Sequence, residues 1–334
     1  MVRRTTIHDV AKAAGVSVAT VSKAVNGRYG ISDRTVARVL AEVERLGYES
    51  SLVASSMRSR QTGVIGVLVP GFEPFTAEIL KGVGGALSSS PLDLLAYSGS
   101  RERAAAGWER RSLQRLSGTL IDAAIMVTPT VVSAASDIPI VAIDPHMGRA
   151  DLPTVESDSF GGGLEATRYL IELGHRRVGF LAGRPDLRSA SLREAGYRRA
   201  LADAGLVFDP SLIEIGRYEI DAARSAARTL LGMANPPTAV FAANDLSALG
   251  LLEVAAELGR RVPEDLSVIG FDDIPESSQR AQPLSTIRQP MQRLGAVAVD
   301  MLLTLLSGEI PAQTRVLLPT RLVIRSTTGP PPRP

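Results

Sequence analysis

From residue 62 onward, short apolar runs alternate with helical stretches, and this alternation constrains the fold most strongly. The apolar runs of the first series are VIGVLVP (64–70), LDLLAYS (92–98), IDAAIMV (121–127) and IPIVAID (138–144). A continuous apolar run of this length is typical of a parallel strand buried on both faces. Helical stretches at about 75–87 and 101–116 provide the crossovers that parallel strands require. The first series therefore predicts an α/β lobe.

A second series with the same alternation begins near Asp158. Its members are helix 160–173, strand 177–183, helix 189–205, strand 212–216, helix 221–233, strand 238–244, helix 246–258 and strand 266–272. A helix at 291–307 and a strand near 315–324 are expected to return to the first lobe. Two such lobes, joined by several crossovers, are predicted to hold a ligand in a cleft at the carboxyl ends of their strands.

The first 49 residues have a different pattern, with three short helices separated by capping residues. Thr6 to Asp9 has the spacing of an N-terminal cap, and Gly15 is suited to end that helix in a left-handed conformation. Ser17 is the expected cap of a second helix that ends at Asn26-Gly27. Ser32 caps a third, longer helix that stops at Gly47. Two short helices across a tight turn, braced by a third, predict a helix-turn-helix unit.

The second helix of this unit presents an almost bare outer face made of Ser17, Val18, Ala19, Ser22 and Lys23. Small side chains let a helix enter the DNA major groove, where hydroxyls bond phosphates and Lys reaches phosphate or guanine. A three-helix bundle that binds another protein is the alternative interpretation.

Charge supports nucleic acid as the partner of this head. Residues 1–60 contain ten Lys or Arg and five Asp or Glu, a net charge of +5, whereas the whole chain carries only +2. A basic head on a mildly acidic body favours binding to a polyanion, although a solvated basic surface has the same composition.

Composition excludes several classes of protein. The 334 residues include no cysteine, which rules out disulfides and thiolate metal sites. No apolar run is long enough to span a membrane, and the N-terminus lacks the apolar stretch of a secretory signal. We therefore expect a cytoplasmic protein with two or more compact units, no membrane partner, no cofactor and no metal.

The segments TIHDVAKAAGVSVATVSKAVNG and ISDRTVARVLAEVERLGYESSLVASSMRSRQTGVIGVLVP closely resemble the N-terminus of the LacI/GalR repressor family. The resemblance runs almost without a gap from Thr6 to about Pro70, and more loosely to about residue 325. It implies a repressor that binds a pseudo-palindromic operator in double-stranded DNA as a homodimer. It also implies that residues 50–60 form a hinge helix, with Met57 as the apolar wedge in the minor groove. A plain linker is the alternative for this serine-rich stretch. The expected DNA contacts are Thr6, Ser17, Val18, Ala19, Thr20, Ser22, Lys23, Asn26 and Met57.

The family body resembles periplasmic sugar-binding proteins, which implies an all-α DNA-binding domain followed by a two-lobed α/β domain that holds a small effector. Matched by motif, the expected effector contacts are Phe75, Asp144, Asp158, Arg193, Tyr218, Asn244 and Asp272. Each has a simpler alternative: Asn244 as a helix cap, the three aspartates as loop or turn residues, Phe75 as core, and Arg193 or Tyr218 as surface residues.

The chain departs from the family pattern in the expected pocket. Glu73-Pro74-Phe75-Thr76 stands where Asn-Pro-Phe-Phe is common, Asp158-Ser159 where Asp-Asn is common, and Arg217 where an acid is frequent. Ser55 likewise stands where an arginine is common in the hinge. A carbohydrate is the expected effector, with carboxylates, phosphates, nucleosides and purines as alternatives for a pocket that contains Arg193.

Enzymatic interpretations have little support in the sequence. His8, His146 and His175 form no recognisable metal cluster, and neither a Gly-x-Ser-x-Gly elbow nor a Walker A loop is present. The glycine clusters 82–86 and 161–163 are expected to be turns or close packing. The alternative to a regulator is a cytoplasmic sugar-binding protein or sugar-processing enzyme with an incidental basic head.

These observations predict the following division of the chain. A DNA-binding domain covers 1–49, a hinge 50–61, and an effector-binding and dimerisation domain 62–325. Within the last, lobe 1 is expected at about 62–157 and 287–325, lobe 2 at about 158–286, and a disordered proline-rich tail at 326–334.

Overall fold

In the computed structural model, the described parts of the chain are residues 5–25, 30–47, 61–99, 108–130, 136–146 and 152–333. They form two units, one of helices up to Thr62 and a larger α/β unit from Gly63 onward. Asn26, Met57 and nearly all of the predicted hinge 50–61 lie outside the described residues.

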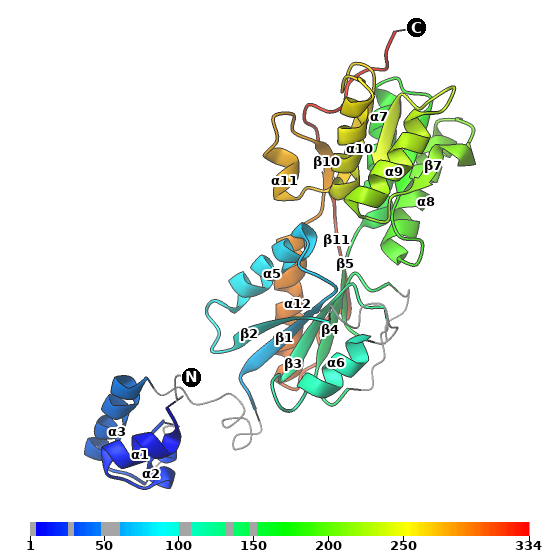
Figure 1. Cartoon of the computed structure of the whole chain (residues 1–334). Coiled ribbons are helices and arrows are strands. Elements are labelled where there is room, and N and C mark those ends of the chain that lie inside the picture. Colours follow the sequence, from blue (N-terminus) through cyan, green and yellow to red (C-terminus); the bar gives the residue numbers. More distant parts are fainter. Residues whose placement is uncertain are drawn as a thin grey trace. The chain divides into compact units, whose positions relative to one another are not determined.

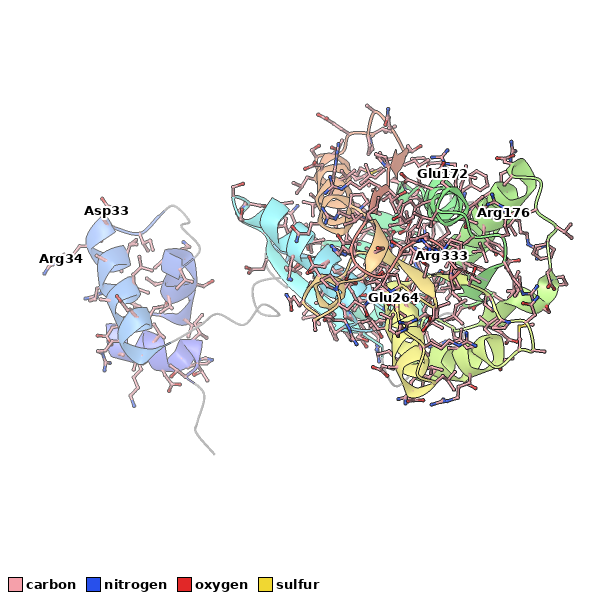
Figure 2. All side chains as sticks on the ribbon, turned by 90° about the horizontal axis from the view of Figure 1, so that it is seen from above. Asp33, Arg34, Glu172, Arg176, Glu264 and Arg333 are labelled. Carbon is pink, nitrogen blue, oxygen red and sulfur yellow. The ribbon has the colours of Figure 1, made fainter. Side chains whose placement is uncertain are left out.

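The helical unit contains α1 (Ile7–Ala14), α2 (Val18–Val25) and α3 (Asp33–Leu46). The predicted caps are confirmed: Thr6 and Asp9 form a reciprocal capping box, Ser32 caps α3, and Gly15 and Gly47 are left-handed at the helix ends. Val10, Val21 and Val39 are fully buried where the three helices meet. Figure 2 shows Asp33 and Arg34 pointing outward from the start of α3, in keeping with their exposure.

Lobe 1 of the α/β unit is a six-stranded sheet in the order β11-β5-β4-β3-β1-β2 (Figure 1). Its strands are β1 (Val64–Val69), β2 (Asp93–Ser98), β3 (Ala123–Val127), β4 (Ile140–Ile143), β5 (Thr154–Ser157) and β11 (Arg315–Leu318). All its pairs are parallel, and β1, β3 and β4 are buried along their whole length, as apolar runs predict.

Three helices complete lobe 1: α5 (Pro74–Leu87), α6 (Trp108–Leu116) and α12 (Met291–Leu306). Helices α5 and α12 pack closely, because a Cβ at Gly82 would lie 1.9 Å from the Gln292 carbonyl oxygen. The predicted close packing of the 82–86 glycine cluster is therefore confirmed at Gly82.

Lobe 2 is a second six-stranded sheet, in the order β12-β10-β9-β8-β6-β7. Its strands are β6 (Val178–Ala182), β7 (Ile213–Ile215), β8 (Ala239–Ala242), β9 (Ser267–Asp272), β10 (Ser285–Arg288) and β12 (Arg321–Val323). The β10–β12 pair is antiparallel and the other pairs are parallel.

Helices cover both faces of this second sheet. They are α7 (Ser159–Glu172), α8 (Arg188–Asp203), α9 (Ile220–Leu231) and α10 (Asp245–Glu257), with a 3-10 turn at Pro210–Leu212 and the short α11 (Pro275–Ser278) beside them. Alternate residues of each strand face opposite layers, so that Phe180 and Phe241 pack on one face and Leu181 and Val240 on the other. The two pairs α7–α8 and α9–α10 supply the helical sides of these two cores.

The chain passes between the lobes three times: from β5 to α7, from β10 to α12, and from β11 to β12. The prediction for 315–324 is therefore only half right. Residues of β11 join the first sheet, but β12 pairs with β10 in the second sheet and so belongs to lobe 2.

The predicted disorder of 326–334 is wrong for residues 326–329. Thr327 is fully buried, donates its hydroxyl to the Val268 carbonyl and accepts from the Ser285 amide. The Gly329 carbonyl accepts from the fully buried His175 ring, which also contacts Ser267. The proline-rich composition gave no sign of Thr327, whose hydroxyl satisfies two buried backbone groups.

Candidate functional site

The helical unit exposes only part of the α2 face that the sequence pattern predicted, because Val18 packs partly against the helical core. Ser17 accepts from the Thr20 amide at 3.1 Å, which caps the helix and holds the first turn of the exposed face. Ser17, Ala19 and Lys23 are exposed, while Val18, Thr20 and Ser22 are half-buried. Thr6 is exposed at the start of α1, where its hydroxyl belongs to the capping box.

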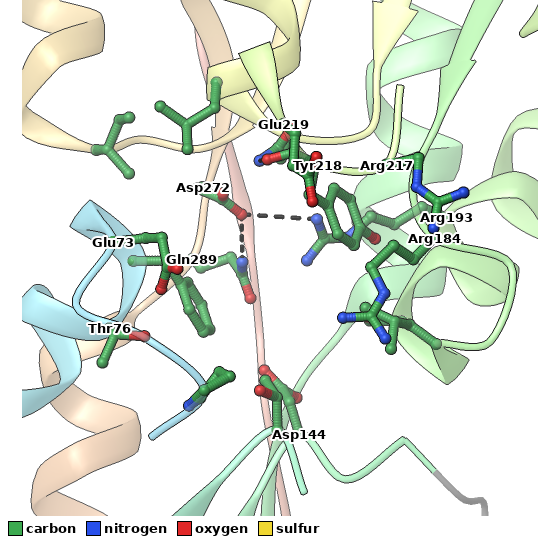
Figure 3. A pocket seen from close by; sticks show the side chains of 18 of the residues that line it. Glu73, Thr76, Asp144, Arg184, Arg193, Arg217, Tyr218, Glu219, Asp272 and Gln289 are labelled. Carbon is green, nitrogen blue, oxygen red and sulfur yellow. Dashed lines mark hydrogen bonds and ion pairs between the residues drawn. The ribbon is translucent and has the colours of Figure 1, made fainter. Parts of the chain in front are cut away.

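A pocket of about 250 Å³ lies between the two lobes of the α/β unit (Figure 3). Lobe 1 contributes the loop after β1, the start of α5 and the residues after β3 and β4. Lobe 2 contributes the residues after β6, β8 and β9, the start of α8 and the turn before α9. Six of the seven predicted effector contacts line the pocket: Phe75, Asp144, Arg193, Tyr218, Asn244 and Asp272.

Asp158, the seventh predicted contact, is not among the residues that line the pocket. Its side chain accepts from the Gly161 amide at 2.8 Å and caps α7. A Cβ at Gly161 would lie 2.2 Å from Asp158 Oδ2, so the Asp158 side chain packs directly on this glycine. Asp158 therefore corresponds to the simpler alternative, a loop residue that starts a helix.

The pocket floor is a buried network centred on Asp272. Arg193 Nη1 lies 3.6 Å from Asp272 Oδ1, and both side chains are more than nine-tenths buried. Arg193 also donates to the Ala243 carbonyl at 2.5 Å and stacks 3.7 Å above the Phe271 ring. Its position is thus set by three independent contacts, and its charge is balanced by Asp272.

Burial changes the acidity of the two aspartates on this floor. Desolvation raises the pKa of Asp144 to about 6, partly offset by the Ser157 amide bond and by Arg193. Desolvation likewise raises the pKa of Asp272, against the lowering effect of Arg193 and Gln289. An ionised carboxylate at either position can accept hydrogen bonds from the hydroxyl groups of a ligand.

Asn244 is a helix cap that also lies at the pocket. Its side-chain oxygen accepts from the Ser247 amide at 3.0 Å and caps α10, while its Nδ2 lies 3.4 Å from the Tyr218 carbonyl oxygen. Asn244 also lines the pocket. The helix cap therefore fixes the amide at the pocket wall.

Non-glycine residues with left-handed backbone gather at this site: Asp144 (φ 44°), Arg217 (φ 56°), Tyr218 (φ 65°) and Asp272 (φ 122°). Each such conformation costs about 1–3 kcal/mol and persists only where the surroundings enforce it. The Tyr218 ring lies against Gly183, where a Cβ would be 2.2 Å from the ring carbon Cζ. These strained backbone conformations thus occur at residues whose polar or aromatic side chains line the pocket.

Sequence reasoning missed several lining residues: Thr128, His146, Arg184, Ser189, Glu219 and Gln289. Thr128, His146, Arg184 and Gln289 each follow a strand by one to three residues. Thr128, His146 and Arg184 lie just beyond the predicted strands 121–127, 138–144 and 177–183, so the expectation of a ligand at the carboxyl ends of strands could have found them. Gln289 follows β10, a strand that the sequence pattern did not reveal. Within the described residues, no group of three or more His, Asp or Glu is arranged to hold a metal ion.

Comparison with known proteins agrees with both units. The description "Bacterial regulatory proteins, lacI family" matches residues 6–51, and "Periplasmic binding protein-like domain" matches residues 167–328. The transcriptional regulator CelR of Thermobifida fusca is 33% identical, covering 97% of this chain and 98% of its own length. The repressor PurR of Haemophilus influenzae strain PittEE is 34% identical, covering 96% and 98%.

Solved structures give the same result. A CelR–cellobiose complex has a TM-score of 0.73 at 32% identity, covering 97% of this chain and all of that one. A lac repressor dimer bound to operator and the anti-inducer ONPF has a TM-score of 0.82 at 27% identity, covering 98% and 100%.

The fold and the pocket define a ligand-binding regulator with a separate helix-turn-helix unit. The chain belongs to the LacI family of bacterial regulatory proteins. It is a DNA-binding transcriptional regulator, and the relatives described above are regulators rather than enzymes. No described helix is long and apolar enough to cross a membrane.

Proposed function

We propose that the chain is a cytoplasmic repressor that binds a pseudo-palindromic operator as a homodimer, and that a sugar in the interlobe cleft changes its DNA affinity. The Arg193–Asp272 pair on the pocket floor carries this proposal. A balanced guanidinium–carboxylate pair offers donors and acceptors side by side, which suits two neighbouring hydroxyl groups.

The other pocket residues support a carbohydrate. Asp144 and Asn244 add acceptors and donors, and Phe75 and Tyr218 provide aromatic surface for the apolar face of a sugar ring. A relative of 32% identity has been solved as a cellobiose complex, and the lac repressor structure holds ONPF. We propose Phe75, Asp144, Arg193, Tyr218, Asn244 and Asp272 as the effector contacts.

The DNA contacts are proposed on the exposed face of α2. Ser17, Val18, Ala19, Thr20, Ser22 and Lys23 would enter the major groove, and Thr6 would contact the backbone from the start of α1. Asn26 and Met57, which lie outside the described residues, complete the proposed set. We place the DNA-binding domain in 1–49, the hinge in 50–61 and the effector-binding and dimerisation domain from residue 62 onward.

The proposed mechanism links the two sites through lobe geometry. An effector that prefers one arrangement of the lobes changes the spacing of the two hinges in a dimer, and half-sites one helical turn apart demand a defined spacing. A differential affinity of about 1–3 kcal/mol gives about a 5- to 150-fold change in operator binding. We assign no catalytic role to the proposed contacts.

A genomic pull-down tests this proposal. The purified full chain is incubated with sheared DNA from its source at near-physiological salt, and the retained fragments are sequenced. A few sharp peaks that share an inverted repeat are expected. Diffuse retention that disappears as the salt concentration rises would show that the chain binds DNA only through non-specific charge interactions. That result would favour the sugar-binding alternative.

A further inference from the structure

Three arginines share one wall of the pocket, and all come from lobe 2 (Figure 3). Arg193 is balanced by Asp272, as described above. Arg184, in the loop after β6, pairs with Asp186 through Nε and Nη2, which leaves Nη1 outside that pair. Arg217, in the turn before α9, makes no hydrogen bond or ion pair with any described residue. Glu219, two residues further on, also lines the pocket, but its carboxylate forms no ion pair with a described residue. Of the three guanidinium groups on this wall, only Arg193 is held by a buried carboxylate.

The Arg184–Asp186 pair does not remove Arg184 from ligand binding. Both side chains are more than one-third exposed, at 39% and 56%, and exposed ion pairs of this kind contribute little net free energy. Asp186 does not line the pocket, whereas Arg184 does. An anionic group of a ligand in the pocket can therefore contact the Arg184 guanidinium without contacting Asp186.

His146 adds a second, independent polar group to this part of the pocket. It follows β4 of lobe 1, is only 9% exposed and lines the pocket, and its ring makes no hydrogen bond with a described residue. Burial and the nearby positive charge of Arg184 lower the pKa of His146 to about 4. The imidazole is thus neutral at pH 7 and carries one N–H that can donate to a ligand in the pocket.

The N-terminus of α8 completes the set. This 16-residue helix has Leu187 at its cap position, without a side-chain cap hydrogen bond, and both Leu187 and Ser189 line the pocket. Uncapped backbone N–H groups at the positive end of a long helix favour an anion. We call Arg184, Arg217, His146 and the start of α8 the arginine corner.

We propose that the arginine corner is an anion subsite for one carboxylate or phosphate group of an acidic sugar whose ring lies on the Asp272 floor. This inference rests on the proposed effector site and specifies the chemical class of its ligand. Glu73 on the opposite wall and Asp272 on the floor disfavour a second anionic group (Figure 3). The effector therefore carries its negative charge at one end and hydroxyl groups at the other.

The first experiment measures the ³¹P line width of millimolar inorganic phosphate in the presence of the full chain. Broadening is expected with the wild type and is lost or strongly reduced in Arg184→Gln and His146→Gln. Arg199→Gln is the matched control, because Arg199 lies on the same helix α8 in an exposed pair with Asp203. An unbroadened wild-type resonance, or equal broadening in all four proteins, would overturn the subsite.

The second experiment is calorimetric titration with glucose, glucuronate and glucose 6-phosphate. Because a charge-assisted hydrogen bond contributes about 1.5–3 kcal/mol, at least one acid should bind about tenfold or more tighter than glucose. A preference for glucuronate identifies a carboxylate and a preference for glucose 6-phosphate a phosphate. Glucose binding as tightly as both acids contradicts the proposal.

If none of the three sugars binds, the phosphate experiment tests the subsite by itself. Broadening of the phosphate resonance would then support the subsite with a different sugar ring, and the absence of broadening would overturn the subsite. Neither experiment contains DNA. A negative result in these two experiments would therefore contradict the anion subsite but not the proposal of a regulator, which the genomic pull-down tests. A negative pull-down would contradict the regulator proposal but not the anion subsite.

Discussion

Gln289 Nε2 donates a 2.6 Å hydrogen bond to Asp272 Oδ1, and Gln289 Oε1 accepts from the Ser157 hydroxyl. Gln289 follows β10 and Ser157 ends β5, so this one side chain, 2% exposed, joins two of the three lobe connections. Ser157 in turn donates its amide to Asp144 at 3.0 Å. The two acids of the pocket floor, one in each lobe, are therefore coupled through Gln289.

We expect Gln289→Leu to lower the free energy of unfolding by about 1–3 kcal/mol, because Asp272 and Ser157 lose a buried partner. Urea denaturation measures this change. Gln279→Leu, at an exposed position after α11, is the matched control and should change stability little. Equal effects of the two substitutions would contradict the role of the Gln289 amide.

Asp272→Ala should abolish the effector response while operator binding persists, because the carboxylate belongs to the pocket floor and not to the helical unit. The measurement is operator binding by fluorescence anisotropy with and without effector. Asp300→Ala, at an exposed position of α12, should retain the response. A response that survives in Asp272→Ala would show that the cleft has been assigned wrongly.

Gly163→Ala should displace α8 and with it Arg193, because a Cβ at Gly163 would lie 2.4 Å from the Arg193 carbonyl oxygen. Overpacking of this kind costs about 1–3 kcal/mol, seen as a lower thermal midpoint in calorimetry. Gly84→Ala on α5 is the control, since no atom lies within 4 Å of its Cβ position. That control should be neutral or stabilising by up to about 1 kcal/mol.

The burial of Asp245 leads us to predict that the free energy of unfolding depends on pH. This fully buried acid accepts from Ser277 and Thr286, and burial together with Asp272 raises its pKa above the ordinary value of 3.8. The folded state then holds a proton that the unfolded state has lost. The stabilising contribution is complete below pH 3.8 and decreases as the pH rises through the higher folded-state pKa.

Asp245→Asn should therefore flatten the fall in unfolding free energy between about pH 4 and neutral pH, which amounts to about 1.4 kcal/mol per pH unit for each proton. Denaturant titrations across that range measure the slope. Asp300→Asn should keep the wild-type slope. An unchanged slope in Asp245→Asn would assign the effect to another group.

Lys23→Ala should weaken operator binding by about 1–3 kcal/mol and reduce its salt dependence by about one phosphate contact, because Lys23 is the exposed cation of α2. Lys81→Ala, in the α/β unit, replaces a lysine paired with Glu78 and serves as the control. Operator affinity that is unchanged by Lys23→Ala would move the DNA contact to other residues.

The helices of the head and the central strands were predictable because their signals are local. Thr6, Ser32, Gly15 and Gly47 act within one turn of chain, and buried parallel strands are apolar along their whole length. The four-residue strands β5 and β10 were missed because Ser, Thr and Glu interrupt their apolar character. These two segments are strands because they form hydrogen bonds with neighbouring strands, and no local sequence pattern encodes that pairing.

The sequence alone determined the class of fold, the helix caps and the basic head, since caps and apolar runs are set by neighbours in the chain. Asp144, Asn244 and Asp272 of the pocket follow predicted strands, whereas Phe75, Arg193 and Tyr218 were expected from the family resemblance. Only the tertiary structure decided that Asp158 caps α7 outside the pocket and that Gln289 joins Ser157 to Asp272. It also decided that Thr327 is buried against Val268. These contacts join residues far apart in sequence, and their free energy comes from satisfying polar groups that only the packed lobes bury.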